Sequence, residues 1–226
     1  MEFITPIFKW IHIIAGVLWI GLLYFFNWIN GHVAATMDGD TKKKVVPELM
    51  PRALYFFRWG AAWTWVTGMV LLLLVYWMQM NDSMFRELGI GEEASKFKHV
   101  AYLIPFIMVF VYDAFYKSSL AKNTRVATIT SFMGIAGVLC LLICVSQMTS
   151  YRAYNIHLGT MFGSMMAFNV WYRIWPAQQR IITAIKNGDA PNPADAGMAG
   201  LRSKHNTYMS VPLIWTMINE HTVGVS

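Results

Sequence analysis

The chain has 226 residues, of which 56% are hydrophobic and only 13% are charged, and it contains 10 Trp, 14 Phe and 16 Met. Soluble chains carry about 25% charged residues, so this composition excludes an ordinary soluble domain and predicts a polytopic membrane protein. Membrane proteins concentrate Lys and Arg in cytoplasmic loops, so the net charge of +6 is assigned to such loops and no nucleic-acid partner is expected.

Six apolar segments, taken in chain order, predict an all-α bundle of about six transmembrane helices that forms a single membrane domain over residues 1–226. The first is interpreted as a retained helix, because it is too long for a signal-peptide core and no small-residue cleavage site follows it. The last is the weakest, because it contains Pro212, Asn219 and Glu220. The predicted spans are residues 6–30, 52–78, 98–116, 126–147, 152–175 and 206–225.

The placement of Lys and Arg predicts how these helices are oriented. The first, third and fifth loops hold most of the basic residues, so they are expected on the cytoplasmic side. The fifth loop includes the Pro-, Gly- and Asp-rich segment 186–200, which follows a short interfacial extension of the fifth helix. Both termini are then periplasmic, and the protein is a multi-pass protein of the bacterial inner membrane.

Four of the six histidines are predicted to lie at one level of the membrane. With a rise of about 1.5 Å per residue, His12 lies about 9 Å below the outer surface, and His157 and His221 lie about 8 Å below it. His99 lies at the outer end of the third helix. Because an ionisable residue in hydrocarbon is costly, it usually has a function.

These histidines can be interpreted in two ways. A lone histidine is most simply a hydrogen-bonded core residue, and that interpretation is kept for His32 and His205 at the cytoplasmic edge. Histidines from several helices at one depth instead indicate a cofactor between the helices, because neutral imidazole binds haem iron, copper or zinc. Haem b is favoured over a bare metal, because the surroundings are broad, aromatic and rich in small residues. The small residues meant are Gly16, Gly21, Gly159 and Gly163, which could equally serve close helix packing.

The axial ligands of the haem iron are predicted to be His12 and His157, on the first and fifth helices. His221 is an alternative ligand or a proton-handling neighbour, and His99 could face a haem propionate or hold a second metal. Two neutral nitrogen ligands would give a six-coordinate, low-spin iron suited to electron transfer.

A second polar layer is predicted on the cytoplasmic side. Arg58 and Asp113 lie about 8–9 Å inside that surface, where unpaired charges are expensive, so they are expected to form an ion pair. The pair could fix helix register, or the residues could instead form a substrate or propionate site.

Four segments occur in an order that resembles one known family. They are HIIAGVLWIGLLYFFN (12–27), PRALYFFRWGAAWTWVTGMVLL (51–72), HLGTMFGSMMAFNVWYRIWPAQQ (157–179) and NTYMSVPLIWTMINEH (206–221). The chain resembles the membrane-embedded N-terminal module of the bacterial membrane-bound, cytochrome c-linked urate oxidases. Members of that family typically continue into a C-terminal c-type cytochrome. The resemblance therefore implies that electrons from urate leave through a cytochrome c on the outer face.

Two classes of function follow from the sequence. The first is a haem b-binding membrane redox subunit that passes electrons from urate or another purine to a separate c-type cytochrome or a respiratory membrane complex. If the chain is itself catalytic, the resemblance implies a urate oxidase-like oxidoreductase. The second class is a cofactor-free subunit with a structural, transport or proton-relay role. Assembly into a homo-oligomer is left open.

Overall fold

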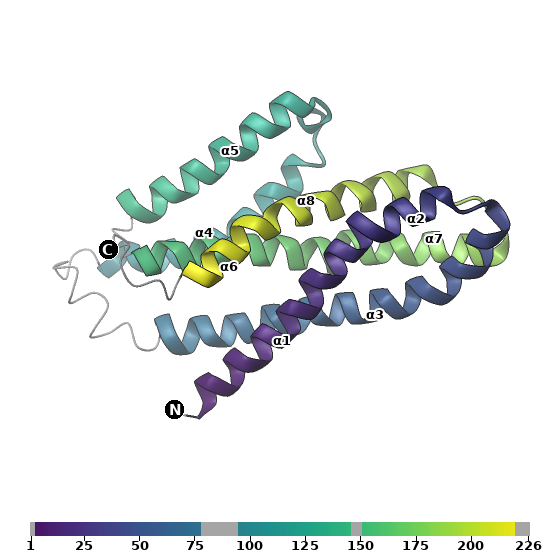
Figure 1. Ribbon diagram of the computed structural model, residues 1–226. Coiled ribbons are helices and arrows are strands. Elements are labelled where there is room, and N and C mark those ends of the chain that lie inside the picture. Colours follow the sequence, from purple (N-terminus) through teal and green to yellow (C-terminus); the bar gives the residue numbers. More distant parts are fainter. Residues whose placement is uncertain (1–2, 78–94, 146–150, 220–226) are drawn as a thin grey trace. The chain divides into compact units, whose positions relative to one another are not determined.

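The computed structural model describes residues 3–77, 95–145 and 151–219. Within these ranges every secondary-structure element is a helix, which confirms the all-α class (Figure 1). The chain divides into two compact units. Unit 1 comprises Met1–Leu71 and Met166–Ser210, and unit 2 comprises Leu72–Met165 and Val211–Ser226.

Unit 1 is built around a hairpin of two long helices. In Figure 1 the first of them runs antiparallel to the second, and the two pack along each other. The unit contains α1 (Ile4–Tyr24), the π-helical turn η1 (Phe25–Asn30), α2 (Gly31–Thr36), α3 (Gly39–Leu71), the π-helical turn η6 (Val170–Ile174) and α7 (Trp175–Asn187). It also holds the end of α6 (Tyr151–Asn169) from Met166 onward and most of α8 (Pro193–Ile218), up to Ser210.

Unit 2 contains the remaining parts of α6 and α8 and several helices of its own. These are the π-helical turn η2 (Leu72–Trp77), α4 (Ser95–Phe115), the short 3₁₀ helix η4 (Ser119–Lys122), α5 (Thr124–Cys140) and the π-helical turn η5 (Leu141–Val145). The Asn123 side chain caps α5 by accepting hydrogen bonds from the backbone N–H groups of Arg125 and Val126.

Two helices begin earlier than the sequence predicts. The helix of the second span starts at Gly39 rather than near residue 52, and it includes Pro47 and Pro51. The helix of the sixth span starts at Pro193 rather than near residue 206. Helix thus occupies part of the segment 186–200, and only residues 188–192 lie between α7 and α8. That this segment is a cytoplasmic connection between two spans stays a prediction.

Local chemistry explains the early start of α8. The Asn192 side chain accepts a hydrogen bond from the Ala194 N–H at 2.9 Å, Pro193 occupies the first position, and Asp195 lies in the first turn. Each of these favours a helix N-terminus. The preceding helix ends at Gly188, whose φ of +81° suits glycine at a helix C-terminus.

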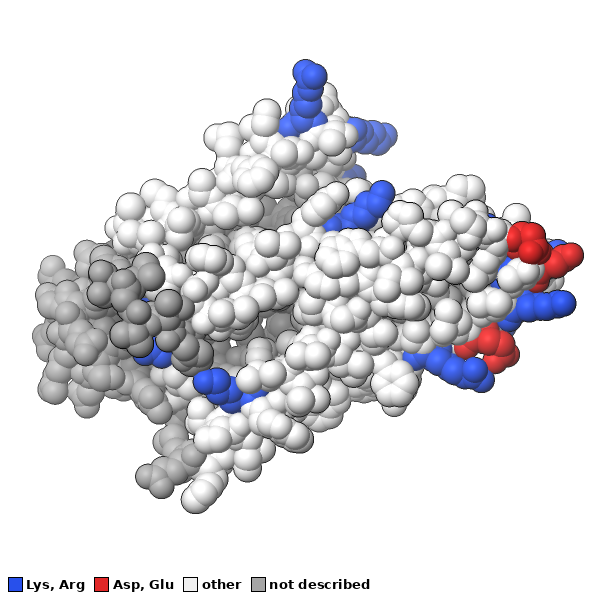
Figure 2. All heavy atoms as spheres, viewed as in Figure 1, with Lys and Arg blue, Asp and Glu red and all other residues white. Residues whose placement is uncertain are grey.

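Three of the described helices are long and apolar enough to cross a membrane. They are Ile4–Thr36, Gly39–Tyr76 and Thr124–Cys144, and Leu103–Phe115 is a shorter apolar helix. Figure 2 shows that most of the visible surface is uncharged and that the acidic residues in this view gather at one end of unit 1. The chain is therefore a membrane protein, whereas six spans and periplasmic termini stay predictions.

Polar side chains hold α8 to the other helices of unit 1. The Asn169 amide donates to Asn206 Oδ1 at 2.8 Å, and Asn206 in turn donates to the Met166 carbonyl at 3.0 Å. The Tyr24 and Ser210 hydroxyls lie 2.9 Å apart. Interhelical hydrogen bonds of this kind are common between membrane helices, where lipid offers no alternative partner.

Candidate functional site

His12 lies on α1 and is held by α3. Its Nδ1 donates to the carbonyl oxygen of Thr64 at 2.9 Å and lies 3.2 Å from Thr67 Oγ1. A carbonyl oxygen can only accept, so Nδ1 carries the proton and Nε2 of the neutral ring keeps its lone pair. A histidine whose Nδ1–H is bound to a backbone carbonyl is the form in which imidazole usually serves as a metal ligand.

Gly68 on α3 makes room for the His12 ring. A Cβ atom at position 68 would lie 2.9 Å from His12 Cε1, closer than side chains tolerate, so any larger residue would displace the ring. Neither Thr64 nor Gly68 stood out in the sequence, because they lie more than fifty positions from His12 and carry no motif. Only the packing of α1 on α3 brings the three together.

His157 belongs to unit 2 and is fully buried, with 0% of its surface exposed. Its ring meets the Tyr76 ring edge to face, with centroids 6.4 Å apart. Near it, Gly159 allows α6 to pack tightly on α8, since a Cβ there would collide with the Thr216 side chain and lie 2.8 Å from Met217 Cε. The predicted joint ligation by His12 and His157 involves both units and stays a prediction.

The other four histidines differ in how much of them the structure describes and in how exposed they are. The backbone of His99 lies in α4, but its side chain lies outside what the structure describes, as does the whole of His221. His32 is exposed and donates from Nδ1 to the Trp28 carbonyl at 2.9 Å, and His205 is partly buried on α8.

Arg58 and Asp113 each have neighbours within their own unit. The Arg58 guanidinium carbon lies 4.1 Å from the centre of the Trp175 ring, and Asp113 forms an ion pair with Lys117 at 2.9 Å. Asp113 is buried, while Arg58 is partly exposed. Arg58 lies in unit 1 and Asp113 in unit 2, so their predicted pairing is not tested and stays a prediction.

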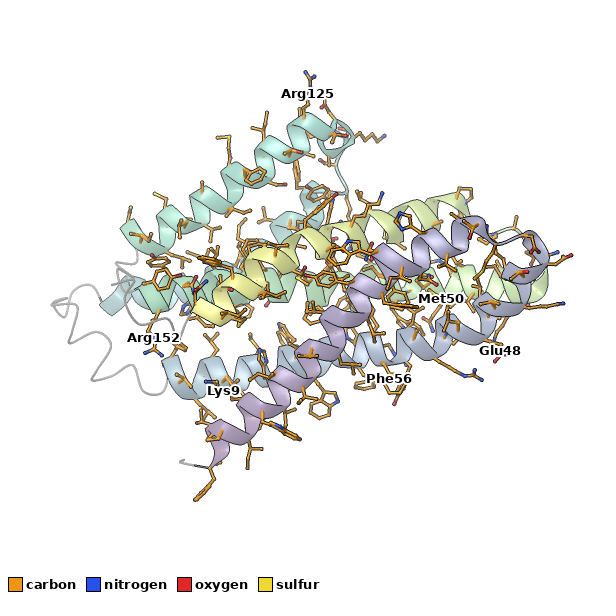
Figure 3. The ribbon with its side chains drawn as sticks, in the orientation of Figure 1. Lys9, Glu48, Met50, Phe56, Arg125 and Arg152 are labelled. Atoms are coloured by element: carbon orange, nitrogen blue, oxygen red, sulfur yellow. The ribbon has the colours of Figure 1, made fainter. Side chains whose placement is uncertain are left out.

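Unit 1 also contains a cavity of about 260 Å³ that the sequence did not reveal. Residues of η1, α2, α3, η6, α7 and α8 line it, and Figure 3 labels one lining residue, Met50. Phe56, on another face of α3, points away and is 55% exposed. The polar lining residues are Asn27, Asn30, Gln178, Ser203 and Lys204, and Phe26 and Phe57 lie among the apolar ones.

In the described residues, no three His, Cys, Asp or Glu side chains are grouped so that they could hold a metal ion. The candidate site of unit 1 therefore consists of the His12 imidazole near one end of the α1–α3 hairpin and the polar cavity near the other. Along α1, His12 and Asn27 are fifteen residues and about 22 Å apart.

Comparison with protein families gives one match: a family described as urate oxidase N-terminal matches residues 38–225. Neither the curated proteins nor the solved structures contain a match to the chain.

Proposed function

Because the chain belongs to the urate oxidase N-terminal family, we propose that it is a membrane redox subunit that holds a haem b through His12. In this role it carries electrons from urate or another purine to a c-type cytochrome on the outer face. The family membership and the apolar helices support a urate oxidase-related membrane protein. The haem and the direction of electron flow are the proposed part.

The observation that carries the proposal is the geometry of His12. Its Nδ1–H is fixed on the Thr64 carbonyl, so Nε2 is the nitrogen available to an iron. The ring is also held in one orientation by α3, because Gly68 leaves space for it and no more. A preset tautomer and a preset ring direction are what an axial ligand requires.

A bound haem b would supply a one-electron carrier inside the membrane, and the chain would tune it through its axial ligands. His157 remains the proposed second ligand, with His221 as the alternative and His99 as a neighbour of a propionate. His157 is fully buried and packed against Tyr76.

A reduced-minus-oxidised visible spectrum of the purified full chain tests the proposal. The wild type should show the α-band of a low-spin b-type haem. His12→Ala should abolish or shift that band, because Nε2 is lost as a ligand. Thr64 contributes only a backbone carbonyl, so Thr64→Val should leave the band in place.

His32→Ala is the matched control, since His32 also bonds a backbone carbonyl through Nδ1 but is exposed. It should keep the spectrum of the wild type. A wild type without haem, or an unaltered band in His12→Ala, would reject the proposal. The result would then favour the alternative of a cofactor-free subunit in which these histidines serve helix packing or proton relay.

A further inference from the structure

The cavity of unit 1 presents polar groups that have no partner in the described part of the chain. Asn27 donates from Nδ2 to the Leu23 carbonyl at 2.9 Å and to Ser203 Oγ at 2.8 Å. Its Oδ1 is therefore the free end of the amide, because a carbonyl partner fixes which end is nitrogen. Asn30 similarly points Nδ2 at Met50 Sδ, 3.8 Å away, and keeps Oδ1 free.

Gln178 and Lys204 supply donors to the same cavity. Neither side chain has a hydrogen bond or ion pair among the described residues, and both line the cavity. Lys204 is exposed and stands at the rim, whereas Gln178 is partly buried. Three helical elements, η1, α7 and α8, thus bring two free carbonyl acceptors, one whole amide and one ammonium group to one cavity. Polar groups converging on an otherwise apolar pocket are the usual sign of a ligand site.

We propose that this cavity binds a small planar anion of the oxopurine class, and that it is the urate site of the proposed function, on which the inference rests. The Asn27 and Asn30 carbonyls accept from ring N–H groups. The Gln178 amide and the Lys204 ammonium group face ring carbonyl oxygens and the negative charge. A ligand with both N–H groups and carbonyl oxygens can pair with this whole set, whereas one without them would leave the donors or the acceptors of the cavity unpaired.

Size and shape agree with such a ligand. The volume of about 260 Å³ lies just below the range of about 300–1,000 Å³ that holds drug-sized molecules. Phe26 and Phe57 line the cavity, and their rings meet edge to face with centroids 5.3 Å apart. Aromatic walls favour a flat ring over a flexible chain.

Equilibrium dialysis of the purified full chain in lipid nanodiscs, with urate as the probe, tests the site. Gln178→Leu should raise the Kd for urate at least tenfold, because it removes the amide without shortening the side chain greatly. Gln179→Leu is the matched control, since the next residue of α7 does not line the cavity. It should change the Kd by less than twofold.

A second variant fills the cavity without removing a contact. A Cβ at Gly200 would meet nothing within 4 Å, and Gly200 lines the cavity, so Gly200→Leu should fold normally and lose urate binding. Absence of urate binding by the wild type, or wild-type affinity in both cavity variants, would overturn the site. The haem spectrum of the same preparations is measured separately. It distinguishes a protein that binds haem but not urate from a protein that binds neither.

Discussion

Arg58 is a cation whose neighbours in unit 1 are aromatic. Its guanidinium lies over Trp175, and Trp171 Nε1 donates to its carbonyl oxygen at 3.1 Å. Within the described residues Arg58 has no ion pair, and its Nε is buried without a hydrogen-bond partner. A charge in an apolar helix is costly unless something stabilises it. The ring faces therefore do part of what a carboxylate would otherwise do, and they tie α3 to α7.

Arg58→Gln and Trp175→Leu should be coupled in a double-mutant cycle. A desolvated cation–π contact contributes about 0.5–2 kcal/mol, so each single change should lower the free energy of unfolding. Trp175→Leu should lower it less in the Arg58→Gln background than in the wild type, because the contact is already lost. Thermal unfolding in detergent measures the four proteins. Arg125→Gln, an exposed residue that Figure 3 shows pointing away from α5, is the control and should have little effect.

Strictly additive effects of Arg58 and Trp175 would contradict this account. The same cycle with Asp113→Asn tests the ion pair predicted from the sequence. Breaking one partner of a buried pair costs about 3–5 kcal/mol, so a double change that recovers stability would support that pair. Additive losses would leave Asp113 with Lys117, its partner in unit 2.

At the scale of elements, one ion pair fastens the middle of α7 to the first turn of α8. Arg180 donates from Nε to Asp195 Oδ2 at 2.9 Å and from Nη2 to Oδ1 at 2.6 Å. This paired geometry is the strong form of the Arg–carboxylate contact. The hydrogen bonds from Arg180 hold the pKa of the Asp195 carboxyl below its usual value.

The contribution of this pair should depend on pH in one direction. Because folding lowers the pKa of Asp195, the stabilisation is fully present above the unfolded pKa of about 3.9 and is lost as pH falls through the folded value. Asp195→Asn should therefore lower the melting temperature at pH 7 more than at pH 3. If the wild type and Asp195→Asn differed in melting temperature by the same amount at pH 7 and at pH 3, the Arg180–Asp195 pair would be excluded as the cause of that difference.

The sequence predicts where these helices lie better than where they begin. Apolar length located the long apolar helices, but the more polar helical segments 39–51 and 193–205 lay outside the predicted spans. Proline is tolerated where tertiary packing supports the helix, and Asn192 and Asp195 stabilise the new start of α8. The cavity could not be predicted, because its residues come from segments that only the folded chain brings together.

At the scale of the whole molecule, two helical stretches exceed the thickness of a membrane. Ile4–Thr36 has 33 residues and Gly39–Tyr76 has 38, which correspond to about 50 and 57 Å. The hydrocarbon core is about 30 Å thick. Each stretch is therefore long enough to extend well beyond it, and the charged start of α3, which carries Lys42–Lys44, is expected outside the hydrocarbon core.

We expect the start of α3 on the cytoplasmic side, because it is rich in lysine. A cysteine introduced by Lys43→Cys should resist a membrane-impermeant thiol reagent added to intact cells and react after the membrane is opened. A cysteine at Phe3, near the N-terminus, should react in intact cells. The reverse pattern would invert the orientation and move the level of His12 to the cytoplasmic side.

The π-helical turns bear on how the length of this chain can change in evolution. Among the described residues they occupy Phe25–Asn30, Leu72–Trp77, Leu141–Val145 and Val170–Ile174. A π-helical turn accommodates one residue more than the α-helix around it. Loss of one residue there restores a regular α-helix, and the side chains before and after it keep the faces on which they pack. Loss of one residue elsewhere in a helix rotates every following side chain about the helix axis by about 100°. Single-residue insertions and deletions among relatives should therefore collect at these four turns.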